Sequence, residues 1–98
     1  MPKVALITLL YNSERFIDNY LKAIEELNYP VDSLDIYFLD NSEAKNHYSL
    51  LEKKTNQAKS KHPITLERSS SNLGFAGGNN YWFKKLIDSD YDYFFLLN

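Results

Sequence analysis

Cysteine is absent from this chain of 98 residues, which excludes disulfides and thiolate metal sites. The chain has no basic run and a net charge of −2, so it lacks the electrostatic footprint of a DNA- or RNA-binding protein. No apolar stretch approaches the ~20 residues of a membrane span, and we expect no signal peptide. We therefore expect a cytoplasmic protein, and association with the inner face of a membrane stays open.

Glycine is also scarce, because the chain has only three, and all of them lie between residues 74 and 78. The length fits one domain, and 44% apolar with 24% charged residues is typical of a globular protein. Residues 91–98 read as a buried apolar strand that stops at the last residue, which is rare for a natural domain. We expect the chain to be part of a longer protein.

Segments with strand and helix character alternate along the chain. Strands are expected at about 3–10, 34–39, 64–67 and 91–98, and helices at about 16–27, 44–60 and 78–87. Continuous apolar runs fit strands that are buried on both faces, and the alternation predicts a parallel sheet with right-handed crossovers. The expected fold class is α/β, a Rossmann-like three-layer α/β/α arrangement with a mainly parallel four-stranded sheet.

Three polar or glycine-rich segments follow the first three strands, at 11–14, 40–42 and 71–78. Ligands of such folds bind outside the carboxyl ends of the strands. Tyr11 could stack on a flat base, and Asn12 could offer its amide or fix the turn. Asp40 could accept from a base N–H or a ribose hydroxyl. A glycine turn that opens a helix is a natural seat for a phosphate.

Structural interpretations of the same residues stay open. Asn12 or Ser13 could cap a helix with Glu14 in its first turn, and Asp40 could form an Asx-turn. The glycines could form only a tight connection from strand to helix. Other polar and aromatic residues are expected outside the site. His47 and His62 are expected as surface histidines, and the lysines at 53, 54, 59 and 61 on the solvent-exposed face of the second helix. Asp88, Asp90 and Asp92 are expected in a turn, and Trp82 and Phe83 in the core.

Residues 72–80, Asn-Leu-Gly-Phe-Ala-Gly-Gly-Asn-Asn, resemble the N-x-G-x-A-G-G-N loop of the rhamnosyltransferase-like branch of glycosyltransferase family 2. These inverting enzymes have the GT-A fold, and the likeness covers this whole chain but only the N-terminal half of such a domain. Tyr11-Asn12 is similar to the family's Y-N pair, whose tyrosine packs on the base. Asp40-Asn41 is similar to its D-D or D-N pair, whose acid contacts the base. Leu9-Leu10 and Ser42-Glu43 depart from the family pattern.

The resemblance implies that residues 1–98 form the nucleotide-sugar-binding half of a glycosyltransferase, truncated at its C-terminus. The enzyme would transfer a sugar, such as rhamnose, from a nucleoside diphosphate to a saccharide or lipid-linked acceptor in polysaccharide biosynthesis. The expected substrate-binding residues are Tyr11, Asn12, Glu14, Asp40, Asn41, Asn72, Gly74, Gly77, Gly78 and Asn79.

The resemblance also implies a divalent cation, Mn²⁺ or Mg²⁺, in the intact enzyme. Its ligands and the catalytic base are expected just after Asn98, so this chain alone should hold no metal and be inactive. The alternative is a non-catalytic nucleotide-binding or regulatory α/β module, and a purely structural interaction domain is a third possibility. An exposed edge at the fourth strand predicts self-association or marginal stability.

Overall fold

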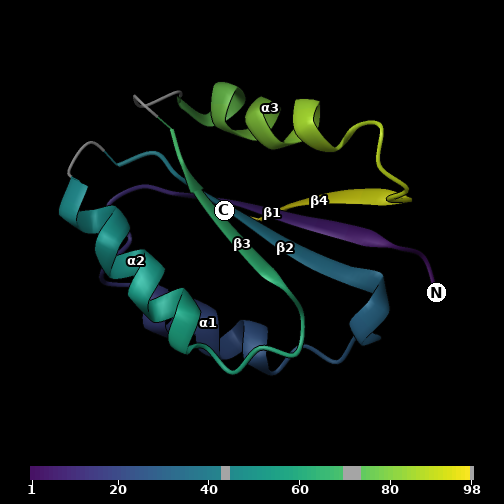
Figure 1. Ribbon diagram of the computed structural model, residues 1–98, viewed down its shortest axis with the longest axis horizontal. Coiled ribbons are helices and arrows are strands. Elements are labelled where there is room, and N and C mark those ends of the chain that lie inside the picture. The colour runs from purple at the N-terminus through teal and green to yellow at the C-terminus, as the bar shows by residue number, and fades with distance from the viewer. Residues whose placement is uncertain (43–44, 70–73, 98) are drawn as a thin grey trace.

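The computed structural model describes residues 1–42, 45–69 and 74–97 (Figure 1). Its elements are β1 (Val4–Leu10), α1 (Ile17–Glu25), a 3₁₀ turn (Val31–Ser33), β2 (Leu34–Asp40), α2 (Lys45–Gln57), β3 (Ile64–Arg68), α3 (Gly74–Leu86) and β4 (Tyr93–Leu97). The predicted alternation of strands and helices is confirmed. None of the helices in the described ranges has the length and apolar character needed to span a bilayer.

The four strands form one parallel sheet in the order β3-β2-β1-β4. The chain steps outward from β1 through β2 to β3, then returns to place β4 on the other side of β1. Helices α1 and α2 cover one face of the sheet, and α3 covers the other (Figure 1). The predicted Rossmann-like three-layer fold is therefore confirmed, and the order of strands reverses between β1 and β4.

The core lies on both faces of the two central strands. Leu6 and Phe38 pack with α1 on one face, whereas Ile7 and Leu39 pack with Trp82 of α3 on the other. This alternation follows from the period of two in a β-strand, and it explains why β1 and β2 read as continuous apolar runs. Trp82 is buried, as predicted.

The start of α1 differs from the expected cap. The helix begins at Ile17, its N-cap is Phe16, and no side chain caps it. The carbonyl of Ser13 instead accepts hydrogen bonds from the backbone N–H groups of Phe16 and Ile17, both at 2.9 Å. Asn12 and Ser13 therefore do not cap this helix, and Glu14 lies in the turn before it rather than in its first turn.

The glycine segment also differs from the prediction. We expected α3 to begin near Gly78 after a glycine loop, but the helix begins at Gly74 and contains all three glycines. Glycine is a poor helix former, so sequence propensity places the boundary too late. Asn72 lies outside the described residues.

Strand β4 is an edge strand rather than a buried one. Phe95 and Tyr93 are 61% and 60% exposed, so the expectation of a buried strand is wrong. Phe83, expected in the core, is partly exposed and stacks on Phe94 with ring centroids 4.7 Å apart. The acidic turn before β4 lies at the amino edge as predicted, where Asp90 contacts the ammonium of Lys3 at 2.9 Å.

Candidate functional site

The carboxyl ends of β1 and β2 are joined by backbone hydrogen bonds. Leu10 is in register with Asp40, and the N–H of Asn41 donates to the carbonyl of Leu10 at 2.8 Å. On the other side of β2, the N–H of Ser69 donates to the carbonyl of Asp40 at 3.2 Å. The ends of β1 and β2 and Ser69 after β3 therefore meet at one edge of the sheet, whereas residues 71–73 of the predicted third segment lie outside the described residues.

Asp40 is the most enclosed polar residue at this edge, with no exposed surface. Its Oδ1 accepts from the backbone N–H of Ser42 at 2.9 Å and lies 3.1 Å from Nδ1 of His47. The bond to Ser42 is the Asx-turn interaction left open by the sequence. Oδ2 has no hydrogen-bond partner within the described ranges. A buried carboxylate oxygen without a donor is unfavourable, so this atom is a natural acceptor for a ligand N–H or O–H.

His47 lies in the first turn of α2 and is buried, so the expectation of a surface histidine is wrong. Its Nε2 accepts from the backbone N–H of Ser13 at 2.9 Å, while Nδ1 faces Asp40. A ring whose Nε2 accepts from Ser13 carries its proton on Nδ1. His47 therefore links the turn after β1 to the end of β2. The spacing of possible ligands in the sequence did not reveal this residue.

His62, the other histidine expected on the surface, is buried too. Its Nε2 lies 2.8 Å from the carbonyl oxygen of Tyr29, at the amino edge of the sheet. It contributes to packing there and has no place in the candidate site.

Two further predicted residues form the turn after β1. Asn12 has a φ of 49°, a left-handed conformation that asparagine tolerates better than most residues. Its backbone N–H donates to Oγ of Ser42 at 2.8 Å. The carboxylate of Glu14 is more than half exposed, and its Oε2 lies 2.9 Å from Nε2 of His47. Asn12 thus fixes the turn, which agrees with one of its two predicted roles.

Tyr11 is half-exposed and lines a pocket of about 470 Å³ between β1 and α1. Thr8, Ser13 and Tyr20 also line this pocket. The hydroxyl groups of Thr8 and Tyr20 are hydrogen-bonded to each other, and burial raises the pKa of Tyr20 above its ordinary value. Tyr11 is accessible to a ligand from this side, whereas Asp40 is enclosed.

Gly78 brings α3 close to the same edge. A Cβ atom at this position would lie 2.8 Å from Cδ2 of Leu9 and 2.9 Å from Nδ2 of Asn41. Asn41 in turn accepts from Oγ of Ser69 at 2.9 Å. Glycine at position 78 therefore allows the helix to approach the ends of β1 and β2, and this explains one of the three glycines by packing.

The remaining predicted residues belong to the first turns of α3. Gly74 and Gly77 are helical rather than part of a loop. Asn79 is buried, and neither its side-chain oxygen nor its nitrogen finds a partner in the part of the chain that the structure describes. Like Oδ2 of Asp40, the amide of Asn79 offers unused hydrogen-bonding capacity near this edge.

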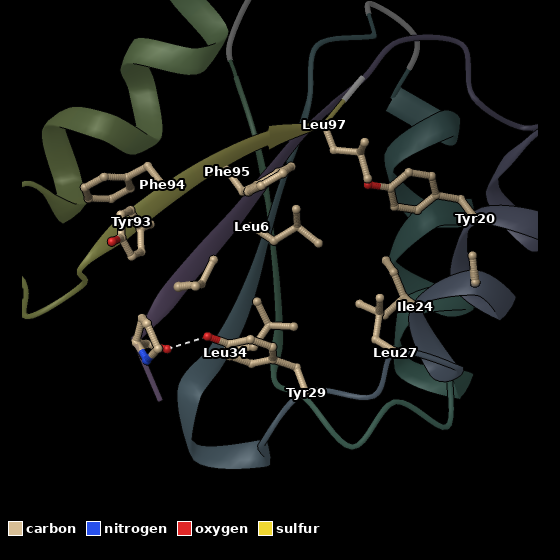
Figure 2. Close-up of a pocket in the computed structure, with 13 residues that line it drawn as sticks. Leu6, Tyr20, Ile24, Leu27, Tyr29, Leu34, Tyr93, Phe94, Phe95 and Leu97 are labelled. Carbon is tan, nitrogen blue, oxygen red and sulfur yellow. Dashed lines mark hydrogen bonds between the residues drawn. The ribbon is translucent and has the colours of Figure 1, made fainter.

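A larger hollow than the pocket beside Tyr11 lies elsewhere. It is an apolar groove of about 770 Å³ between α1 and the β1–β4 half of the sheet (Figure 2). Tyr20 and Ile24 of α1 lie on one side of it, and Leu6, Phe95 and Leu97 of the sheet lie on the other (Figure 2). Its lining is almost entirely hydrophobic, so it suits packing against another apolar surface better than binding a charged nucleotide.

A metal centre finds no support in the described ranges, where no three His, Asp or Glu side chains come together closely enough to hold an ion. The residues that the structure describes therefore do not fit a divalent cation on their own.

Together, the fold and the edge define a class: a Rossmann-like α/β protein with polar turns gathered at the carboxyl ends of its strands, the usual place for a nucleotide in such sheets. No protein-family model matches the chain, and a search of curated proteins gives no match either. Among solved structures, the chain is similar to the mannosyltransferase PcManGT from Pyrobaculum calidifontis, determined in complex with GDP-Man and Mn²⁺.

That likeness has a TM-score of 0.74 at 24% sequence identity. It covers 86% of this chain but only 24% of the mannosyltransferase, so this chain spans about a quarter of that protein's length. At this identity the likeness shows the fold alone. The sheet and helices described above thus have the Rossmann-like arrangement found in part of a glycosyltransferase.

Proposed function

We propose that this chain is the nucleotide-sugar-binding portion of a glycosyltransferase similar to family 2. The enzyme would transfer a sugar, such as rhamnose, with inversion from a nucleoside diphosphate to a saccharide or lipid-linked acceptor. With a lipid-linked acceptor, the reaction would take place at the cytoplasmic face of a membrane. The observation that carries the proposal is the convergence of Tyr11, Asp40 and Gly78 at one edge of a sheet whose fold is shared with a glycosyltransferase.

Each residue has a role that suits its surroundings. The half-exposed ring of Tyr11 would stack on the base, and Oδ2 of Asp40 would accept a base N–H. Asn41 and Asn79 would contribute amide contacts to the ribose or phosphates. The first turn of α3, with Gly74 and Gly77, would place backbone N–H groups and the positive end of the helix dipole near the diphosphate.

The proposal includes a divalent cation, which would bind the diphosphate of the nucleotide sugar. The neighbouring mannosyltransferase was determined with Mn²⁺ and GDP-Man. Because the described residues hold no metal cluster, we assign no chemical step to an ion here. The catalytic base and the metal ligands of the intact enzyme would lie outside residues 1–98.

The regulatory alternative is weaker at one position. A phospho-acceptor module would need a carboxylate that is free to act as a nucleophile, whereas Oδ1 of Asp40 is occupied by Ser42 and His47. These contacts suit a fixed acceptor of hydrogen bonds better than a nucleophile.

Backbone NMR of the ¹⁵N-labelled chain tests the proposal directly. UDP, dTDP and GDP are titrated separately with Mg²⁺. We expect at least one of them to shift the amide signals of residues 11–13, 40–42 and 77–79. Amide signals at the amino edge, such as those of His62 and Asp90, serve as the internal control and should stay in place.

Two outcomes would reject the proposed function. One is the absence of shifts with all three nucleotides at millimolar concentration. The other is an identical pattern with pyrophosphate and Mg²⁺, because the site would then recognise phosphate without a base.

A further inference from the structure

We propose that His47 is a positioning residue for base recognition, a role that rests on the proposed nucleotide site. It holds the turn that carries Tyr11 against Asp40 and leaves Oδ2 of Asp40 as the oxygen available to a base. The argument begins with the ring itself, which is buried between the turn after β1 and the end of β2.

The two ring nitrogens of His47 have different partners, so only one orientation of the ring makes both contacts. Nδ1 lies 3.1 Å from Oδ1 of Asp40, and a proton there makes a hydrogen bond to a charged acceptor. Nε2 then has a lone pair, which the backbone N–H of Ser13 uses at 2.9 Å. Glu14 lies equally near Nε2, but its carboxylate requires a proton on that atom. The contacts with Ser13 and Glu14 are therefore mutually exclusive.

A second bridge runs parallel to the first. The N–H of Asn12 donates to Oγ of Ser42, while the N–H of Ser42 donates to Oδ1 of Asp40. Two successive backbone N–H groups after Tyr11 are thus held by side chains that follow β2. Because both bridges end on Asp40, the position of the Tyr11 turn and the orientation of the carboxylate are coupled.

The coupling decides which carboxylate oxygen is available. Ser42 and His47 both engage Oδ1, and Oδ2 keeps its lone pairs without a donor in the described ranges. Asp40 is enclosed, so a base reaches Oδ2 only when the neighbouring segments separate. Uracil, thymine and guanine carry a ring N–H on the edge that such an oxygen would bind, whereas cytosine and adenine present a lone pair there.

The tautomer is tested first and needs no nucleotide. Long-range ¹H–¹⁵N spectra of the chain at pH 8 should show the His47 ring neutral, with the proton on Nδ1 and none on Nε2. A proton on Nε2 would overturn the inference, because the bonds to Asp40 and Ser13 could not both exist.

Binding is tested with variants of both buried histidines. His47→Leu removes both bonds, whereas His47→Asn keeps a donor close to the place of Nδ1. His62→Leu is the matched control, since His62 is equally buried but contacts Tyr29 at the opposite edge. The probes are UDP with CDP and GDP with ADP, each with Mg²⁺, and dissociation constants are measured by calorimetry.

We expect His47→Leu to weaken the favoured nucleotide about tenfold, as for loss of a hydrogen bond to a charged group, and to erase the preference for UDP over CDP or GDP over ADP. His47→Asn keeps the donor to Asp40 but loses the acceptor for Ser13, so it should restore only part of the affinity and the preference. His62→Leu should change neither beyond about twofold. If His47→Leu does not fold, the nucleotide binding of His47→Asn and the tautomer of the wild-type His47 ring still test the inference.

The failures are distinguishable. If the wild-type chain binds none of the four nucleotides and does not bind dTDP either, the proposed function fails and this role fails with it. If it binds, and His47→Leu keeps wild-type affinity and base preference, only the role of His47 is overturned. Equal losses in His47→Leu and His62→Leu would also overturn it, since they would report general destabilisation.

Discussion

Gly78 of α3 lies so close to Asn41 at the end of β2 that a Cβ atom on the glycine would be 2.9 Å from Nδ2 of the asparagine. The same atom would be 2.8 Å from a methyl group of Leu9 in β1. The helix therefore touches both central strands at the candidate site through a residue without a side chain.

The substitution Gly78→Ala should destabilise the chain. Alanine is favoured over glycine inside a helix by about 1 kcal/mol, but the ends of the Leu9 and Asn41 side chains must shift to admit the methyl group, so we expect a net loss of no more than about 1 kcal/mol. Asn80→Ala is the control, since Asn80 is exposed in the same helix and alanine should be neutral or stabilising there. Urea unfolding measures both. A Gly78→Ala variant more stable than wild type would contradict the close approach.

The substitution Asp40→Asn should separate stability from binding. The amide keeps the shape and an oxygen for Ser42 and His47, while it removes a buried charge whose Oδ2 lacks a donor in the described part of the chain. We expect the free energy of unfolding to stay within about 1 kcal/mol of wild type or to rise. Nucleotide binding, measured by calorimetry, should fall at least tenfold. Unchanged binding would remove Asp40 from the site.

The exposed face of β4 should cause the isolated chain to associate. Phe95 is 61% exposed beside the apolar groove, on an edge strand with unpaired backbone groups. Phe95→Lys should reduce the association seen by sedimentation velocity, because a charge on an edge strand opposes pairing. Phe16→Lys, at a similarly exposed phenylalanine away from that groove, is the control and should leave association unchanged. A wild-type chain that stays monomeric at every concentration would contradict this prediction.

Glu67 should make stability depend on pH. Lys85, 2.7 Å from its carboxylate, and the hydroxyl of Tyr81 lower the pKa of Glu67 below its ordinary value. A lowered pKa in the folded state contributes stability above the ordinary carboxyl pKa, and this contribution is lost as the pH falls through the lowered value. The pair is partly exposed, so we expect at most about 1 kcal/mol.

Unfolding of wild type and Glu67→Gln at pH 7 and pH 3 measures this contribution. The stability difference should be present at pH 7 and shrink at pH 3, and added salt should weaken it at pH 7. A difference that grows on acidification would show that the lowered pKa is not the cause.

The amino-acid pattern was sufficient for the fold, because apolar runs and helical periodicity report directly on burial. Leu6 and Ile7 show this, since adjacent residues of β1 enter opposite halves of the core. The same reasoning placed Tyr11 and Asp40 at one edge. Whether these residues bind a nucleotide stays a prediction.

His47 was missed because its partners come from separate turns, and no local spacing encodes a contact between Ser13 and a helix 34 residues later. The start of α3 was missed for a different reason. Gly78 lowers the helix propensity of this segment, but the close approach of α3 to Leu9 favours glycine there. Tertiary packing therefore outweighs local propensity at this position. The exposure of β4 depends on which strands flank it, which its own residues do not specify.

The pairing of β1 with β4 has a consequence for biosynthesis. Val4 is in register with Tyr93, so the central strand acquires one of its two neighbours only from the far end of this chain. A ribosome must translate almost all of these codons before β4 can pair with β1. Until then, the apolar side of β1 that β4 covers stays uncovered. Such distant pairings slow folding and leave apolar surface exposed while the chain is incomplete.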